Sequence, residues 1–236
     1  MSEAFDKVRG VRELPLFPLP LVLFPGVPLP LHIFEQRYRR MLVDVRASNS
    51  LFGLSYFDAD EAIDARPPAG QVGCAAEVVE VQPQPDGRSN ILTIGLVRYR
   101  LVEYVDAGEP YLVGRVEFFE DDPDTTGEVI ASAGEVADLF TRIARSVRVV
   151  NDDRAGLPDL NAIEPERLSF FVAAAMEMEA GDKQKLLELR STVERLRRLQ
   201  ALLAQVVISY EERARVHQVA KSNGHSGQPL KLEPEE

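Results

Sequence analysis

Cysteine is almost absent from this chain. Cys74 is the only one among 236 residues, so the chain can form no disulfide within itself and no metal site built from several cysteines. This composition agrees with a reducing compartment. Cys74 lies in the apolar run 72–81, where we expect a buried structural thiol and not a nucleophile.

Basic residues are outnumbered by acidic ones. The chain has 38 Asp and Glu against 27 Lys and Arg, which gives a net charge of −11. Nucleic acid is held mainly by Lys and Arg side chains that neutralise phosphates, so this charge argues against a nucleic-acid partner, although a local basic stripe stays compatible with it. The acidic balance itself is typical of a soluble protein.

The sequence signatures of catalysis, phosphate binding and metal binding are also missing. None of the fifteen glycines is followed by lysine, which excludes the G-x-x-x-x-G-K-[ST] loop, and G-x-G-x-x-G, G-x-S-x-G and H-E-x-x-H do not occur. The histidines, His32, His217 and His225, fall in a strand end, a helix end and the tail. We therefore predict no catalytic residue, no metal site and no cofactor, while composition alone leaves a Ser/His/Asp triad open.

The long apolar stretch at 14–34 is not expected to cross a membrane. It is uncharged and long enough to span a bilayer, but it contains six prolines. Proline removes N–H donors and prevents the regular helix that a bilayer core requires. The stretch also lacks the features of a signal peptide. We interpret it as two extended pieces joined by a turn at Phe24-Pro25-Gly26, in a cytoplasmic protein.

The first half of the chain has the pattern of short strands with one helix among them. Further strands are expected at 51–57, 72–81, 91–105 and 111–119. Asp86-Gly87 is a strong hairpin signal. The apolar stripe of the intervening helix consists of Phe34, Tyr38, Met41, Leu42 and Val45. This number of short strands indicates a small closed or nearly closed barrel.

Beyond an acidic connector at 120–124 the pattern becomes helical. A first helix is expected at about 128–150, a second begins at Pro165, and a third carries apolar residues at a 3–4 spacing from Leu186 to Val207. The polar residues from Gln218 onward indicate disorder. We predict an α+β protein with a β-barrel domain at 10–120, a helical bundle domain at 125–217 and a disordered tail at 218–236.

Several longer motifs occur in a characteristic order. The opening LPLFPLPLVLFPGVPLPLHIFEQRYRRML contains V-L-F-P-G and P-L-x-I-F-E-x-R-Y, and FGLSYF, VGCAAEVVEV and GLVRYRLVEY follow it. The helical segment LSFFVAAAMEMEAGDKQKLLELRSTVERLRRLQALL comes last. In content and order these motifs resemble the N-terminal, substrate-binding domain of Lon protease, especially its free-standing bacterial form. The resemblance covers about residues 10–205.

This resemblance implies a PUA-like barrel followed by a helical bundle, and a non-enzymatic module that binds unfolded or partner polypeptide. In Lon the ATPase and the Ser-Lys protease follow this region, and we expect the chain to end before either. The residues expected to contact a partner are His32, Glu35, Arg37, Tyr38 and Arg40. The alternative is that Glu35, Arg37 and Tyr38 only pin the helix to the barrel.

Two functions of other classes stay open at this point. PUA-like barrels also occur in RNA-binding proteins, an alternative that the acidic charge argues against. A cryptic hydrolase would need a pocket that holds a nucleophile and a base. The sequence names neither the partner nor the oligomeric state.

Overall fold

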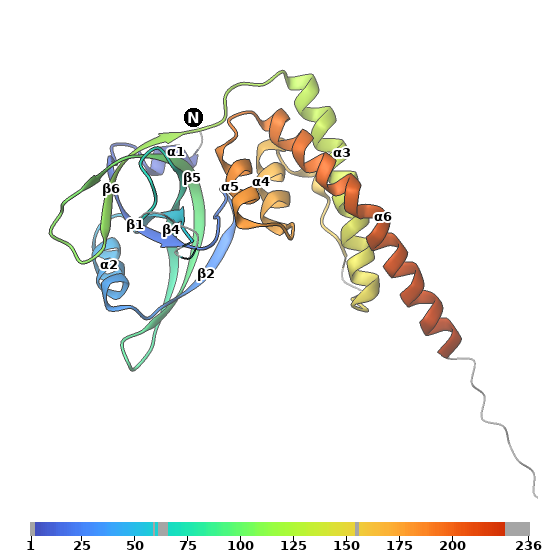
Figure 1. Ribbon diagram of the computed structural model, residues 1–236, viewed down its shortest axis with the longest axis horizontal. Coiled ribbons are helices and arrows are strands. Elements are labelled where there is room, and N and C mark those ends of the chain that lie inside the picture. The colour runs from blue at the N-terminus through green and yellow to red at the C-terminus, as the bar shows by residue number, and fades with distance from the viewer. Residues whose placement is uncertain (1–2, 59, 61–65, 154–155, 225–236) are drawn as a thin grey trace, which may run out of the picture.

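The computed structural model describes residues 3–58, 60, 66–153 and 156–224 of the chain. A strand-rich part comes first and a helical part follows it (Figure 1). The elements in chain order are α1 (Glu3–Lys7), β1 (Glu13–Leu19), β2 (Pro28–Ile33), α2 (Gln36–Ala47), β3 (Leu51–Tyr56), β4 (Val72–Pro83), β5 (Ser89–Val105), β6 (Leu112–Phe119), α3 (Thr126–Val150), the 3-10 turn η1 (Leu160–Ala162), α4 (Pro165–Ala175), α5 (Ala180–Glu188) and α6 (Thr192–Gly224).

The strands form one mixed sheet in the order β2-β5-β4-β3-β1-β6. β1 and β3 pair in parallel, whereas the pairings of β4, β5 and β6 with their neighbours are antiparallel. β6 pairs with β1 through 112–115 and with β5 through 113–119, so the ladder of β1, β3, β4, β5 and β6 returns to its first strand. β2 stands outside this ring and pairs with the first part of β5. The chain is therefore α+β, with the helical region after the sheet.

Two turns predicted from the sequence are confirmed. The β4–β5 hairpin closes through an N–H of Gln84 that donates to the carbonyl of Arg88 at 2.8 Å, and Gly87 has a φ of 80°. Between β1 and β2, Gly26 has a φ of 76° and donates its N–H to the carbonyl of Gly95 at 2.8 Å. Both backbones lie in the left-handed region, which glycine enters without a steric penalty.

The helix α2 packs on the sheet through the predicted apolar stripe, with one correction. Its buried side chains are Tyr38, Met41, Leu42 and Val45. Phe34, the first residue of the predicted stripe, is 59% exposed because α2 begins only at Gln36. The backbone at Glu35 is extended, with a ψ of 137°, so the side chain of Phe34 does not follow the helical spacing that predicted its burial.

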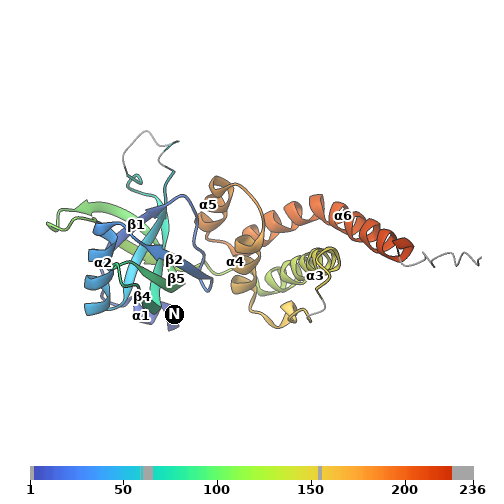
Figure 2. The ribbon, with the colours of Figure 1, turned by 90° about the horizontal axis from the view of Figure 1, so that it is seen from below.

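The helices α3 and α6 run side by side in the same direction (Figure 1). Arg142 of α3 and Glu211 of α6 form an ion pair at 2.8 Å between them. α4 and α5 lie between this pair and the sheet (Figure 2). α4 begins at Pro165, as predicted, because proline fits the first helical position, where no intrahelical bond to its nitrogen is needed.

The third predicted helix is two helices, α5 and α6, which are separated at 189–191. Arg98 of β5 donates through Nη1 to the carbonyl of Leu187 at 3.0 Å and to that of Leu189. Asp124 accepts the N–H of Val193 at 3.0 Å, in the first turn of α6. These side chains satisfy the backbone groups that a helix end leaves unpaired, so the chain can turn there despite its continuous apolar spacing.

The end of α6 also differs from the prediction. The helix runs to Gly224, past Gln218, where the tail was predicted to begin. Lys221 forms an ion pair with Asp152, which follows α3, so the neighbouring helix supports this extension. The rest of the predicted tail, 225–236, lies outside the described residues.

The sheet and the helical part share a buried core. One apolar cluster joins Phe24 and Val72, from the strand-rich part, to Phe170 of α4 and Leu187 of α5. The rings of Phe24 and Phe170 lie 6.1 Å apart. A second cluster joins the sheet to α2. The division into domains at 10–120 and 125–217 stays a prediction, and the two parts pack across its boundary.

A buried ionic cluster lies at the same junction. Asp121 of the connector pairs with Arg98 of β5 and with Arg195 of α6. The side chains of Arg98 and Arg195 are 1% and 0% exposed, and that of Asp121 is 7% exposed. Arg195 also donates through Nε to the hydroxyl of Ser169 in α4 at 2.7 Å. The cluster thus ties β5, the connector, α4 and α6 together.

Candidate functional site

The residues predicted to contact a partner lie around the start of α2, and three of them form its exposed rim. His32 of β2 is exposed, and its Nδ1 lies 2.7 Å from Oδ1 of Asn90. Its ring stacks on that of Phe34 with the centroids 5.9 Å apart. Glu35, immediately before α2, accepts a bond from Nε of Arg37 at 2.9 Å. This rim therefore presents two rings and one ion pair to solvent.

Tyr38 points away from the rim into the core. It is 5% exposed, and its ring centroid lies 4.1 Å from that of Phe17. The guanidinium of Arg37 lies over the Tyr38 ring at 4.5 Å. Burial raises the pKa of the Tyr38 hydroxyl. Tyr38 therefore anchors α2 to the sheet and offers a partner little surface.

Arg40 is held by two acidic groups, one on α2 itself and one in the segment before β6. It donates through Nε to Oδ2 of Asp44 at 2.9 Å and lies 3.9 Å from Glu109. The hydroxyl of Tyr111 donates to the same carboxylate oxygen at 3.0 Å. Burial and then this bond raise the pKa of Tyr111 to about 12. The five predicted residues thus do not converge on one pocket.

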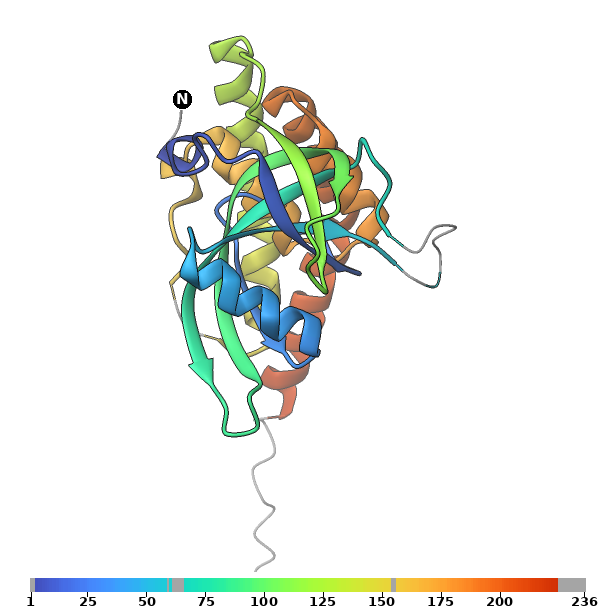
Figure 3. The same ribbon diagram turned by 90° about the vertical axis from the view of Figure 1, so that its left-hand side faces the viewer.

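A groove of about 550 Å³ lies between α2 and the hairpin of β4 and β5, and Figure 3 shows these two elements beside each other. We call it the α2–hairpin groove. Its helical wall consists of Gln36, Arg39, Arg40, Leu42, Val43 and Arg46. Its hairpin wall consists of Val81, Pro83, Gly87 and Ser89. Apolar and guanidinium groups share one surface here, a combination that is enriched where proteins bind one another.

The helical spacing of α2 explains how these groups come to face the groove. Arg39, Val43 and Arg46 follow one another at i, i+4 and i+7, so they lie along one face. Val43 is 61% exposed. Arg39 lies against the hairpin turn, so close that a Cβ at Gly87 would be 2.0 Å from its Nη2. Glycine at this turn leaves room for the guanidinium.

Sequence reasoning identified Arg40 of this groove and missed the other two arginines. The signal for Arg39 and Arg46 was present in the polar face of the predicted helix. No local signal placed the hairpin beside that face. Its position follows from the pairing of β5 with β2, which leads directly into α2.

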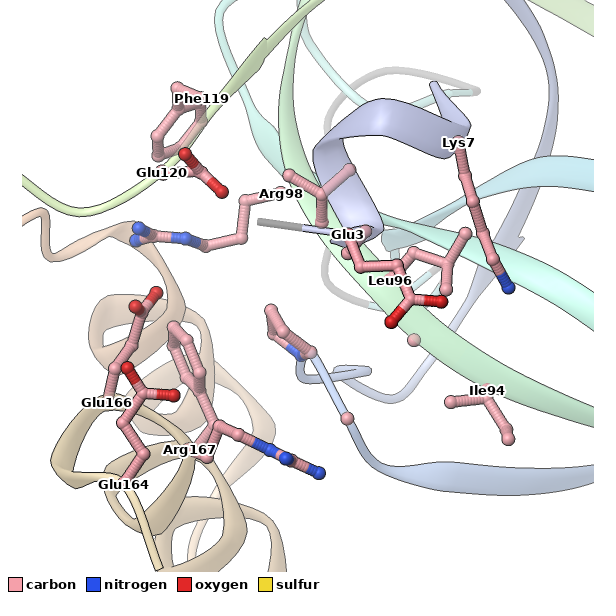
Figure 4. A pocket seen from close by; sticks show the side chains of 16 residues that line it. Glu3, Lys7, Ile94, Leu96, Arg98, Phe119, Glu120, Glu164, Glu166 and Arg167 are labelled. Carbon is pink, nitrogen blue, oxygen red and sulfur yellow. The ribbon is translucent and has the colours of Figure 1, made fainter. Parts of the chain in front are cut away.

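A second cavity, of about 440 Å³, lies where α1, β5 and α4 meet (Figure 4). Glu164 and Glu166 of the α4 start lie on one side of it, and Arg98 lies near them. The Arg98 guanidinium is already paired with buried Asp121. Burial, and then Asp121, raises the pKa of Glu166. Arg98 and Glu166 of this cavity therefore take part in the contacts that join the sheet to the helices.

Cys74 is fully buried, as predicted, and burial raises the pKa of its thiol to about 12. At neutral pH it is a protonated packing group. Within the described ranges, no group of three or more His, Cys, Asp and Glu is placed to hold a metal ion. His225 lies outside these ranges.

The described part of the chain holds no candidate membrane-spanning helix. None of its helices combines the length and the apolar character that crossing a bilayer requires.

Comparison with known proteins gives one consistent family. Residues 13–205 match the model of the ATP-dependent protease La (LON) substrate-binding domain. The chain is 30% identical over 220 residues to a Lon protease of Cytophaga hutchinsonii, covering 90% of this chain and 26% of that protein. It is 30% identical over 194 residues to Lon protease 2 of Syntrophobacter fumaroxidans, covering 81% and 24%. The chain thus spans about a quarter of the length of these curated relatives.

Two solved structures share the fold. The N-terminal domain of the Mycobacterium avium complex Lon protease aligns with a TM-score of 0.65 and 18% identity, covering 82% of this chain and 98% of that one. A Lon N-terminal domain protein from Xanthomonas campestris aligns with a TM-score of 0.59 and 24% identity, covering 81% and 98%. Since the family model also spans most of the sequence, the chain belongs to the family of the Lon protease substrate-binding domain.

Proposed function

We propose that this protein is a non-enzymatic module that binds unfolded or partner polypeptide through the α2–hairpin groove. In this proposal a PUA-like barrel at 10–120 carries the groove, and a helical bundle at 125–217 is docked on the barrel. The family supports a substrate-binding role. The observation that carries the choice of site is the groove itself, in which exposed apolar side chains and guanidinium groups occur together.

The groove has the chemistry that polypeptide binding needs. Val43 projects from α2 with 61% of its surface exposed, and Leu42, Val81 and Pro83 line the groove with it. Covering such side chains with apolar groups of a partner gains about 25 cal/mol for each Å² removed from water. Arginine at the rim adds hydrogen bonds without closing the groove to different sequences.

The test places a charge on the apolar surface of the groove. Val43→Asp should weaken capture of a permanently unfolded model protein by about tenfold, because it removes the exposed apolar side chain and its carboxylate pairs with Arg39 and Arg46 one turn away on either side. Its folding stability should change by less than about 1 kcal/mol, since Val43 is exposed and valine and aspartate have similar helix propensities.

The matched control is Val216→Asp. Val216 is 60% exposed on α6, at a distance from the groove along the chain and in the fold. Capture can be measured by isothermal titration calorimetry and stability by urea unfolding. Equal capture by the wild-type protein and Val43→Asp would show that polypeptide does not bind in the groove. If both variants capture the unfolded protein more weakly, the added negative charge, and not its place in the groove, would account for the loss.

A further inference from the structure

We propose that the α2–hairpin groove prefers polypeptide segments in which apolar residues are interspersed with Asp or Glu. This inference rests on the proposed polypeptide-binding function and names the class of segment that the groove accepts. It depends on which arginines of α2 are paired within the protein and on which are directed to the groove.

The arginines of α2 and the hairpin fall into two groups. Arg37 pairs with Glu35 at 2.9 Å, Arg40 with Asp44 at 2.9 Å, and Arg88 with Asp86 at 2.8 Å. These cations are already compensated by neighbouring carboxylates. They add little net positive potential to the surface around them.

Arg39 and Arg46 form the second group. Both are exposed and line the groove, and neither has a salt-bridge partner among the described residues. They lie two helical turns apart on the face that carries Val43 between them. No acidic side chain is among the described residues that line the groove. Asp86 at the hairpin turn, which is paired with Arg88, is close enough to Arg39 for the two charges to interact. A bound segment would thus meet two guanidinium groups that no salt bridge holds, with an apolar contact between them.

The charge of the whole chain sets these two arginines apart. With a net charge of −11 the protein is acidic as a whole, so Arg39 and Arg46 carry the charge opposite to that of the chain. A locally basic groove on such a surface can hold carboxylates that other surfaces reject. Arginine suits this role because its planar fork binds a carboxylate through two parallel hydrogen bonds.

The lining favours polypeptide over nucleic acid. Single-stranded nucleic acid is usually held by aromatic side chains on which the bases stack. No aromatic residue is among the described residues of the groove, whose apolar surface comes from Leu42, Val43, Val81 and Pro83. Aliphatic surface of this kind packs against aliphatic side chains of a peptide.

The experiment compares three labelled peptides of equal length that differ only in their polar residues. All contain the same leucines and valines, interspersed with Glu, Gln or Lys, and binding to the full chain is followed by fluorescence anisotropy. We expect the Glu peptide to bind about tenfold more tightly than the Gln peptide and the Lys peptide to bind most weakly. The advantage of the Glu peptide should shrink at high salt.

The test variant is Arg39→Gln with Arg46→Gln, which should abolish the difference between the Glu and Gln peptides. The matched control is Arg142→Gln with Arg197→Gln, which removes the same charge from exposed positions of α3 and α6. It should retain the preference of the wild-type protein. Circular dichroism and urea unfolding of both double variants confirm that they are folded.

The outcomes separate this inference from the function on which it rests. Equal binding of the Glu and Gln peptides, or an unchanged preference in Arg39→Gln with Arg46→Gln, would overturn the inference and leave polypeptide binding intact. Failure of all three peptides and of unfolded model proteins to bind would refute the proposed function itself. Tighter binding of a single-stranded RNA of similar length, lost in the groove variant, would assign the groove to nucleic acid and overturn both.

Discussion

The replacement of Asp121 by Asn tests the most heavily buried charges among the described residues. Asp121 is the carboxylate that contacts both Arg98 and Arg195, whose side chains are 1% and 0% exposed. Thr192 also donates its hydroxyl to Asp121. Asparagine keeps the shape of the side chain and removes its negative charge, so the variant changes electrostatics with little change in packing.

The expected loss is large because the two guanidinium groups cannot return to water in the folded protein. Breaking a buried ion pair by removing one partner costs about 3–5 kcal/mol, since the other charge is left buried without compensation. The amide NH₂ of asparagine also presents a donor where both arginines need an acceptor. Against a typical domain stability of about 5–15 kcal/mol, Asp121→Asn should lose a large share of the free energy of unfolding.

The adjacent residue supplies the control. Asp122 forms an ion pair with Arg190 at 2.6 Å, but its side chain is 61% exposed. Asp122→Asn should therefore cost at most about 1 kcal/mol. Urea unfolding of the wild-type protein and the two variants, followed by far-ultraviolet circular dichroism, measures the three free energies under one set of conditions.

The comparison refutes the reasoning if Asp121→Asn loses less than about 1 kcal/mol or no more than Asp122→Asn. That result would mean that water or rearranged side chains compensate Arg98 and Arg195 after the charge is removed. A large loss accompanied by separate transitions of sheet and helices would show that the cluster holds together two parts that can each fold.

Two further predictions concern backbone contact and pH. Gly95→Ala should lower the free energy of unfolding by about 1–3 kcal/mol, because its Cβ would lie 2.2 Å from the carbonyl oxygen of Phe24. Gly134→Ala in α3 is the control: its Cβ meets nothing within 4 Å, so the free energy of unfolding should rise by about 0.5–1 kcal/mol. Equal effects of the two substitutions in urea unfolding would contradict this account. Burial, then Asp121, raises the pKa of Glu166 in the folded state, so its contribution favours folding at acid pH and is lost as the pH rises through the folded pKa. Glu166→Gln should therefore gain stability relative to the wild-type protein between about pH 4 and 7, and a constant difference across this range would show that the pKa is unchanged by folding.

Local signals predicted most of the individual elements. The Asp86-Gly87 turn and the helix start at Pro165 are each encoded in a few neighbouring residues, and both are present. The turn needs a residue that adopts a positive φ, and the helix start needs a residue that tolerates an unbonded nitrogen. Neither requirement depends on the rest of the fold.

The break between α5 and α6 could not be predicted in this way. The apolar spacing continues across 189–191 and favours one helix. The chain turns there because Arg98, 91 residues before Leu189, takes up its carbonyl. Asp124, 69 residues before Val193, then accepts an N–H from the start of α6. Contacts of this range are fixed by the tertiary fold, which overrides the local pattern.

The predicted site likewise combines features that local sequence predicts with contacts that only the tertiary fold provides. The sequence correctly located a helix with arginines on its outer face, but it could not show which residues of that helix meet groups from other elements. Arg40 pairs with Asp44 one turn further along α2, and the segment before β6 adds Glu109 and Tyr111 to this pair. Tyr38 was predicted to reach a partner, yet it packs against Phe17 of β1. The contacts of Glu109, Tyr111 and Phe17 join α2 to segments that are distant in the sequence.

The outer edge of β2 bears on how a polypeptide could be held. The carbonyl of Val27 accepts the N–H of Gly95 at 3.0 Å, and the carbonyl of Leu29 accepts the hydroxyl of Thr93 at 2.9 Å. The carbonyls of residues 27 and 29 are therefore directed toward β5. In an antiparallel pair the backbone groups of the residues between them are directed to the opposite side.

The residues directed outward on β2 include Pro28 and Pro30, which have no N–H to donate. A partner strand adding to this edge would meet no backbone donor before His32, so its main-chain bonding would be incomplete. Proline in such positions is a common protection of an exposed sheet edge. Because strand addition at β2 is disfavoured, the side chains of the α2–hairpin groove offer the better means of holding an extended segment.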